Sequence, residues 1–175
     1  EWAVSYPDKV ERLLPVIGTA YIDSFSAIRL ERWAQPIKQD KDWNKGAYSL
    51  TQQPEGLTRA LAYVIQDALN PELFNKTYPA PSLDKAIHQD IQAELPAWTQ
   101  LISAAKQRSA QMDANSLLYL VRASQLWRAG MGDNWQQALS RVKAKTLFLP
   151  ASGDLLLPPA LSQHSAAAMT AGGNI

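Results

Sequence analysis

Two short apolar segments near opposite ends of the chain constrain its fold more than any other feature. Residues 12–18 and 145–151 each carry a nearly continuous run of aliphatic and β-favouring side chains. Such runs are typical of parallel strands covered on both faces, whereas a strand with one wet face alternates apolar and polar residues. Pro15 argues against the first strand, because proline has no N–H to donate to a ladder. The sequence therefore predicts two buried parallel strands, the first one weakened at Pro15.

The stretch between these segments, residues 21–142, is predicted to be helical. Apolar side chains recur there at the i, i+3, i+4, i+7 spacing of an amphipathic helix. The three clearest stripes cover residues 30–37, 57–68 and 83–105, and include Leu30, Ile37, Leu57, Leu61, Ile91 and Ala105. Pro96 should kink or split the third stripe. Asp113, and either Asp133 or Asn134, are expected to cap two further helices.

Two strands with flanking helices make a sheet too narrow to cover its own apolar side chains. Parallel strands also leave unpaired backbone groups at both edges unless neighbouring strands cover them. The rest of the sheet is therefore expected to lie outside this chain. We expect the exposed apolar surface to produce a homo-oligomer or to bind a missing partner chain.

Composition excludes several classes of function. The 17 basic and 16 acidic residues are well mixed, so a nucleic-acid partner has little support. The absence of cysteine excludes a disulfide framework, a thiolate nucleophile and a cysteine-ligated zinc ion. No apolar run approaches the roughly 20 residues of a membrane helix. We expect a small-molecule substrate, no metal, no membrane partner and a cytoplasmic location, although no targeting signal is visible.

Four segments carry a recognisable pattern: EWAVSYPDKV at 1–10, DKDWNKGAY at 40–48, MDANSLLYLVRA at 112–123, and the strand and turn at 141–159. The first is similar to the helix that directly follows the nucleophile elbow in the homoserine O-acetyltransferases, a family of the α/β-hydrolase superfamily. The second and third resemble that family's Asp-Pro-x-aromatic-x-x-Gly-x-Tyr and Asp-Ala-Asn-Ser-Tyr-Leu-Tyr-Leu-Thr-Arg-Ala stretches. The fourth resembles its acid-bearing strand and turn.

The resemblance implies an α/β fold, an incomplete α/β-hydrolase with two core parallel strands and a large helical lid insertion. Residues 1–20 would be a core segment with a helix end and a strand, residues 21–140 the lid, and residues 141–175 the core segment that carries the acid turn. The chain would begin just after the nucleophile elbow and end before the catalytic histidine.

Asp154 stands where the family places its catalytic acid, the carboxylate that holds the histidine base in the correct tautomer. The resemblance places the serine and the histidine outside this chain, so His164 and His88 are expected to be surface or packing residues. Arg122 and Tyr119 are candidate substrate-binding residues of the lid. No bound cofactor is expected, since acetyl-CoA would be the acyl-donor substrate.

The implied reaction moves an acetyl group from acetyl-CoA to a hydroxyl such as that of homoserine, through an acyl-serine intermediate. The chain alone would be inactive. Homoserine-specific relatives carry a Gly-Arg-x-Phe segment in the lid, whose arginine pairs with the amino acid's carboxylate, and residues 72–110 lack it. An esterase or thioesterase is therefore an alternative, and so is a non-catalytic helical interaction module.

Overall fold

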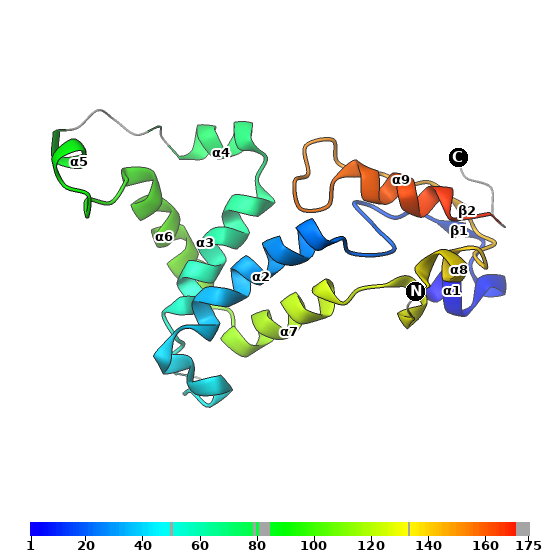
Figure 1. Cartoon of the computed structure of the whole chain (residues 1–175), viewed down its shortest axis with the longest axis horizontal. Coiled ribbons are helices and arrows are strands. Elements are labelled where there is room, and N and C mark those ends of the chain that lie inside the picture. Colours follow the sequence, from blue (N-terminus) through cyan, green and yellow to red (C-terminus); the bar gives the residue numbers. More distant parts are fainter. Residues whose placement is uncertain (50, 79, 81–84, 133, 171–175) are drawn as a thin grey trace. The chain divides into compact units, whose positions relative to one another are not determined.

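The computed structural model describes residues 1–49, 51–78, 80, 85–132 and 134–170 (Figure 1). Helices dominate, and short 3-10 turns (η) link several of them. The elements in chain order are α1 (Trp2–Ser5), η1 (Pro7–Lys9), β1 (Arg12–Leu13), α2 (Ser24–Lys38), η2 (Lys41–Gly46), α3 (Gly56–Ala68), α4 (Pro71–Thr77), α5 (Lys85–Gln89), α6 (Pro96–Ser109), α7 (Ala114–Gln125), η3 (Ala129–Met131), α8 (Trp135–Leu139), β2 (Lys145–Thr146) and α9 (Pro159–Ala167).

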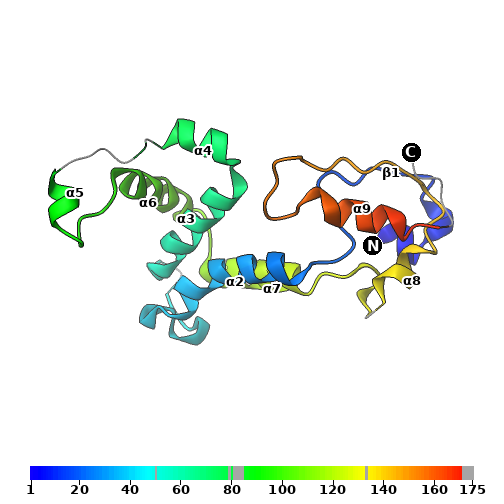
Figure 2. The ribbon, with the colours of Figure 1, turned by 45° about the horizontal axis from the view of Figure 1, so that its top comes forward.

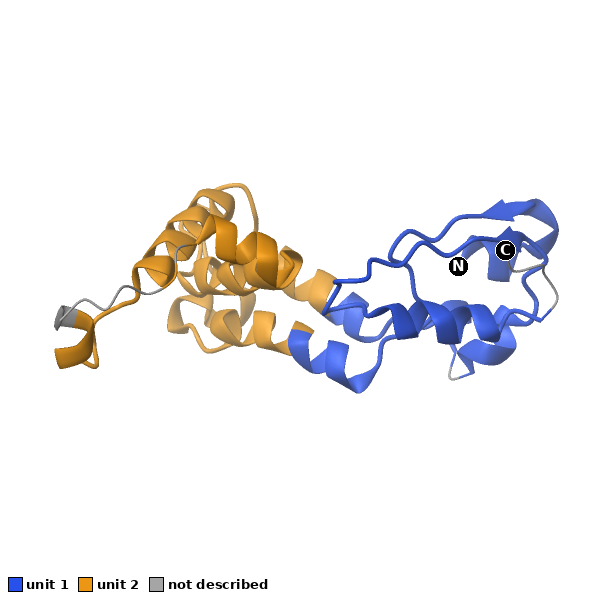
Figure 3. Ribbon diagram, turned by 90° about the horizontal axis from the view of Figure 1, so that it is seen from above, with its two compact units in different colours: residues 1–29, 122–175 blue, residues 30–121 orange. Residues whose placement is uncertain are grey.

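The chain folds as two compact units, coloured separately in Figure 3. Unit 1 comprises residues 1–29 and 122–175, so it is built from both ends of the chain and contains both strands. Unit 2 is the continuous stretch 30–121. It contains α3 to α6 together with most of α2 and α7.

The two strands of unit 1 pair in parallel, with Arg12 opposite Lys145 and Leu13 opposite Thr146. The predicted parallel arrangement is confirmed. The predicted lengths are wrong, because each regular strand contains only two residues.

Pro15 is the physical reason for the short first strand. In a parallel ladder the carbonyl of Leu147 would accept a hydrogen bond from the N–H of residue 15, and proline has none. Beyond this gap the pairing resumes as a single bridge between Val16 and Leu149. There the Leu149 N–H donates to the Pro15 carbonyl over 2.9 Å, and the Leu149 carbonyl accepts from the Ile17 N–H over 2.8 Å.

The strand pair has one covered face and one exposed face. On the covered face Thr146 is buried, and Leu13 and Phe148 pack against the core of unit 1. Alternate residues of a strand point to opposite faces. The aliphatic side chains of the other face are all exposed, and we call them the aliphatic face: Leu14 (55%), Val16 (63%), Leu147 (41%) and Leu149 (44%).

Small side chains dominate the core of unit 1. The buried members are Ala3, Val4, Ala20, Ala129, Ala138, Leu139, Val142, Ala144 and Met169. Helix α9 begins at Pro159, as the Pro158-Pro159 pair indicates, and lies against the segment after β1 (Figure 2). Two serines fix this contact: Ser162 Oγ donates to the Gly18 carbonyl over 2.8 Å, and Ser165 Oγ accepts from the Ala20 N–H over 2.9 Å.

Unit 2 is a helical cluster in which α3 packs along α6. The first two predicted stripes are confirmed, since Leu30, Ile37, Leu57 and Leu61 are buried. The third stripe is split before Pro96, which starts α6, but its membership was partly wrong because Ile91 is fully exposed in the turn between α5 and α6. Leu83, the first residue of that stripe, lies outside the described residues.

The predicted N-caps that fall on described residues are confirmed. Asp113 Oδ2 accepts from the Ser116 N–H over 2.7 Å at the start of α7. Asn134 Oδ1 accepts from the Gln137 N–H over 2.8 Å at the start of α8. Asp133, the alternative cap for α8, lies outside the described residues.

Candidate active site

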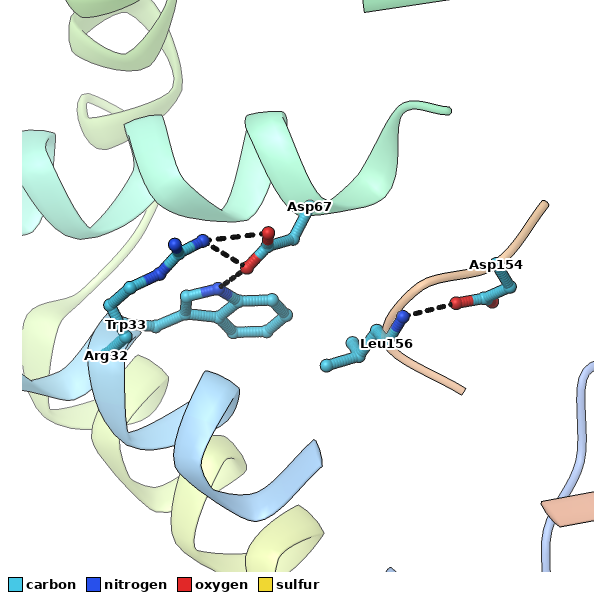
Figure 4. Close-up of polar contacts among 5 residues, drawn as sticks. All are labelled: Arg32, Trp33, Asp67, Asp154 and Leu156. Carbon is cyan, nitrogen blue, oxygen red and sulfur yellow. Dashed lines mark hydrogen bonds and ion pairs between the residues drawn. The ribbon is translucent and has the colours of Figure 1, made fainter. Parts of the chain in front are cut away.

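Asp154 lies in a turn that follows β2 and its last bridge at Leu149, and we call residues 151–157 the acid turn. The half-buried carboxylate is held by the backbone of its own turn. Its Oδ1 accepts from the N–H of Leu156 over 2.8 Å (Figure 4) and from the N–H of Leu157, also over 2.8 Å. The Asp154 N–H donates to the Ala151 carbonyl over 3.1 Å. Within the described residues, Oδ2 makes no hydrogen bond, so it is available to a further donor.

The position of this turn suits a catalytic acid. Parallel strands end at the same edge of a sheet, and the sites of open α/β sheets lie at that carboxyl edge. Asp154 follows β2 in this direction. A carboxylate fixed by two N–H donors, with one oxygen available, can orient an imidazole and stabilise its protonated form.

The two histidines lie away from the acid turn in the chain and are both exposed. His164 Nδ1 is 3.0 Å from the Tyr21 hydroxyl, so this ring forms a surface contact between α9 and the segment before α2. Burial, and then the charge of Asp23, raise the pKa of the Tyr21 phenol. His88 is on α5.

The two candidate substrate-binding residues both lie on α7. Tyr119 is 78% exposed, and Arg122 is exposed as well. No ion pair joins Arg122 to an acidic group of the described chain. Their proposed role in binding substrate stays a prediction.

In unit 2, one buried carboxylate binds an arginine. Asp67 has a side chain only 2% exposed, and both its oxygens accept from Arg32 Nη2 over 2.8 Å. Trp33 Nε1 donates to Asp67 Oδ2 over 2.7 Å (Figure 4). The Arg32 guanidinium also lies 5.0 Å from the centre of the Tyr63 ring. The Arg32 guanidinium therefore already has an anionic partner and an aromatic partner within unit 2.

Segments 40–48 and 112–123 are hydrogen-bonded to one another. The Tyr48 hydroxyl donates to Asp113 Oδ1 and accepts from the Asn115 N–H over 3.0 Å. Asn115 Oδ1 accepts from Trp43 Nε1 over 2.8 Å, and its amide Nδ2 donates to the Gly46 carbonyl over 3.1 Å. Segments 40–48 and 112–123 thus form one hydrogen-bonded framework within the protein.

Local chemistry explains the unusual residues of this framework. Gly46 has a φ of +94°, and a Cβ there would stand 3.3 Å from the Asn115 side chain, so glycine fits both demands. Burial and the hydrogen bond to Asp113 raise the pKa of the Tyr48 phenol. The hydrogen bond from Tyr48 lowers the pKa of Asp113, and the Ser116 N–H adds to this effect.

Sequence reasoning missed the contacts of Ser26, Arg32 and Asp67. Ser26 contacts Leu156, which is 130 residues away, and Arg32 contacts Asp67, which is 35 residues away. The spacing of residues within one helix or turn cannot predict contacts over such sequence separations. The one local signal was Asp23, an N-cap type of residue three positions before Ser26.

Two features of the described residues bear on other kinds of site. No group of three or more acidic and histidine side chains of the described chain is placed to hold a metal ion. Among the described residues, no helix is both long enough and apolar enough to cross a membrane.

Comparison with known proteins gives a consistent fold. No protein-family model matches the sequence. A homoserine O-acetyltransferase of Methanosalsum zhilinae is 25% identical over 177 residues, which cover 98% of this chain and 35% of that protein. The crystal structure of esterase E22 matches with a TM-score of 0.90 and 43% identity, covering 99% of this chain and 50% of that one. The homoserine O-acetyltransferase of Bacillus anthracis matches with a TM-score of 0.89 and 24% identity, covering 99% of this chain and 48% of that one.

Each of these matches covers only part of the other protein. The chain spans about half the length of the solved structures, and less than half the length of the curated relative. In each case nearly the whole of this chain is matched.

Proposed function

We propose that this chain, which has the fold of the α/β-hydrolases, is the lid and acid-bearing part of an enzyme that moves an acyl group through an acyl-serine intermediate. The observation that carries the proposal is Asp154, a half-buried carboxylate at the carboxyl end of a parallel strand pair with one oxygen held by two N–H groups. The serine and the histidine would come from the rest of the protein.

In the proposed reaction, Asp154 accepts a hydrogen bond from the histidine ring and holds its tautomer. The histidine takes the proton of the serine hydroxyl as the serine oxygen attacks the donor's carbonyl carbon. The same proton then passes to the leaving thiolate or alkoxide. In the second half, the histidine takes the acceptor's proton as the acceptor oxygen attacks the acyl carbon, and returns that proton to the serine oxygen as the acyl–serine bond breaks.

A hydroxyl such as that of homoserine is the first candidate acceptor, with acetyl-CoA as donor. Its support is the series of curated relatives named homoserine O-acetyltransferase, which match nearly the whole chain. The helical lid would limit the access of water to the acyl-serine, as transfer to a hydroxyl requires.

Water is the second candidate acceptor, and two observations favour it. The match to esterase E22 has 43% identity, against 25% for the curated homoserine O-acetyltransferase of Methanosalsum zhilinae. An arginine fork is the natural clamp for an amino acid's carboxylate, and residues 72–110 lack the Gly-Arg-x-Phe segment that carries it in homoserine-specific relatives.

The acceptor can be decided on the full-length protein. Release of free CoA from acetyl-CoA is measured with and without homoserine, and acetate release from a simple acetyl ester is measured in parallel. Homoserine-dependent CoA release supports the transferase. Turnover that ignores homoserine overturns the transferase and supports the esterase.

The role of Asp154 is tested by Asp154→Asn, with Asp8→Asn as the matched control. Asp8 is an exposed aspartate that pairs with Lys143 over 2.7 Å. We expect Asp154→Asn to lower kcat by roughly 10³- to 10⁴-fold, because the histidine loses its orienting carboxylate, and Asp8→Asn to leave kcat unchanged. Full activity of Asp154→Asn would refute the assignment. A non-catalytic module is supported instead if the wild-type protein turns over neither substrate.

A further inference from the structure

Ser26 is a buried polar side chain that is hydrogen-bonded to the acid turn. It lies in the first turn of α2 and is fully buried. Its hydroxyl Oγ donates to the Leu156 carbonyl over 2.6 Å. Ser26 and Leu156 both belong to unit 1, although 130 residues separate them in the chain.

Leu156 is held at both of its backbone polar groups. Its carbonyl accepts from Ser26, while its N–H donates to Asp154 Oδ1 over 2.8 Å. Leu156 thus links α2 to the Asp154 carboxylate through two hydrogen bonds. Leu157 supplies the second N–H on the same oxygen, so displacement of this peptide segment would move both donors of Asp154 together.

Ser26 is itself fixed by the start of its helix. Asp23 Oδ1 accepts from the Ser26 N–H over 2.8 Å, and the Asp23 carbonyl accepts from the Ala27 N–H over 2.9 Å. This is the geometry of an N-cap, which anchors the first turn of a helix. The hydroxyl of Ser26 is therefore presented to the acid turn from a rigid support.

We propose that Ser26 is a positioning residue for Asp154: it holds Leu156 so that the carboxylate keeps one oxygen on the backbone and turns the other toward the histidine. The inference rests on the proposed function and adds to it a residue that never touches the substrate. Removal of the hydroxyl leaves the carbonyl of the half-buried Leu156 without this donor, so the turn shifts to satisfy it.

The predicted consequence is a change in the histidine as well as in the rate. A displaced carboxylate stabilises the protonated imidazole less, so the pKa of the histidine falls. In Ser26→Ala we expect kcat to fall about tenfold with KM unchanged. The acid limb of the profile of kcat/KM against pH should move to lower pH.

The experiment compares Ser26→Ala with Ser26→Thr and Ser162→Ala in the full-length protein. Thr keeps the hydroxyl and should restore both the rate and the acid limb. Ser162 is the matched control: it is also buried in unit 1 and also donates to a carbonyl, that of Gly18 over 2.8 Å, but it has no bond to the acid turn. Amide hydrogen exchange at Leu156 and Leu157 is measured in every variant.

Faster exchange at these two amides in Ser26→Ala alone, with the shifted acid limb, supports the proposal. Unchanged exchange and an unchanged limb in Ser26→Ala overturn it, even when Asp154→Asn abolishes activity and the proposed function stands. A wild-type protein without acyl-transfer or esterase activity overturns the proposed function and, with it, the role of Ser26 in positioning a catalytic acid. The exchange data then decide separately whether Ser26 holds the turn.

Discussion

At the scale of residues, segments 40–48 and 112–123 supply structure more clearly than chemistry. Tyr48 and Asp113 bond one another, and Asn115 ties the turn at Gly46 to α7. Each of these side chains satisfies a backbone group or another motif residue. Segments 40–48 and 112–123 carry much of the resemblance to a family. Their polar side chains are explained, within unit 2, by the hydrogen bonds of one loop and of the start of α7.

The Tyr48–Asp113 bond predicts a dependence of stability on pH. The pKa of Asp113 is lowered in the folded chain, so its contribution is complete above the pKa of the unfolded state and is lost as pH falls through the folded value. We expect Asp113→Asn to flatten the loss of stability below about pH 5, because Asn keeps the cap without titrating. Urea midpoints from pH 3 to 7 check this, with Asp8→Asn as the control. Parallel curves for wild type and Asp113→Asn would contradict it.

The Arg32–Asp67 pair predicts an asymmetric cost of mutation. Asp67 is 2% exposed, whereas Arg32 is 45% exposed and keeps contact with water when its partner is removed. Arg32→Met should lower the free energy of unfolding by about 3 kcal/mol, because the buried Asp67 carboxylate loses its guanidinium partner. Asp67→Asn should cost about 1 kcal/mol. Urea unfolding measures both, and Arg59→Met, from an exposed pair with Glu55, should cost less than about 0.5 kcal/mol. Equal costs for Arg32→Met and Asp67→Asn would refute the argument.

At the scale of elements, local signals were sufficient for the helices and their ends. Stripes of period 3.6 located α3, and capping residues located the starts of α7 and α8. The predicted strand lengths were wrong, because Pro15 has no N–H to donate and interrupts the ladder between Leu13 and Val16. Asp154 could be picked out from the sequence by resemblance to a family. Its support by Ser26 could not, since that contact joins residues 130 apart.

Pro15 gives a prediction about one rung of the ladder. Pro15→Ala restores an N–H opposite the Leu147 carbonyl, so the new amide should exchange as slowly as that of Leu149, which already donates to residue 15. Pro7→Ala is the control, because residue 7 opens a 3-10 turn, where the first N–H groups have no helical partner. Hydrogen exchange measures both amides. Fast exchange at residue 15 would show that more than the missing N–H keeps the strands apart.

At the scale of the whole molecule, the aliphatic face predicts self-association. Its four side chains are between 41% and 63% exposed on one side of the strand pair, and contiguous apolar surface of this kind promotes association. Val16→Lys with Leu147→Lys should lower the sedimentation coefficient of the isolated 175-residue chain toward that of a monomer. The control pair, Leu73→Lys with Met131→Lys, alters exposed apolar side chains elsewhere. A monomeric wild-type chain would exclude this behaviour.

Unit 1 has a consequence for the order of events on the ribosome. Its first strand is translated long before the second, because the whole of unit 2 is encoded between them. At ordinary rates of synthesis the nascent β1 waits on the order of ten seconds for its partner. Unit 2, being continuous, can fold during that interval. Within unit 1, β1 is therefore open to chaperone binding throughout that interval.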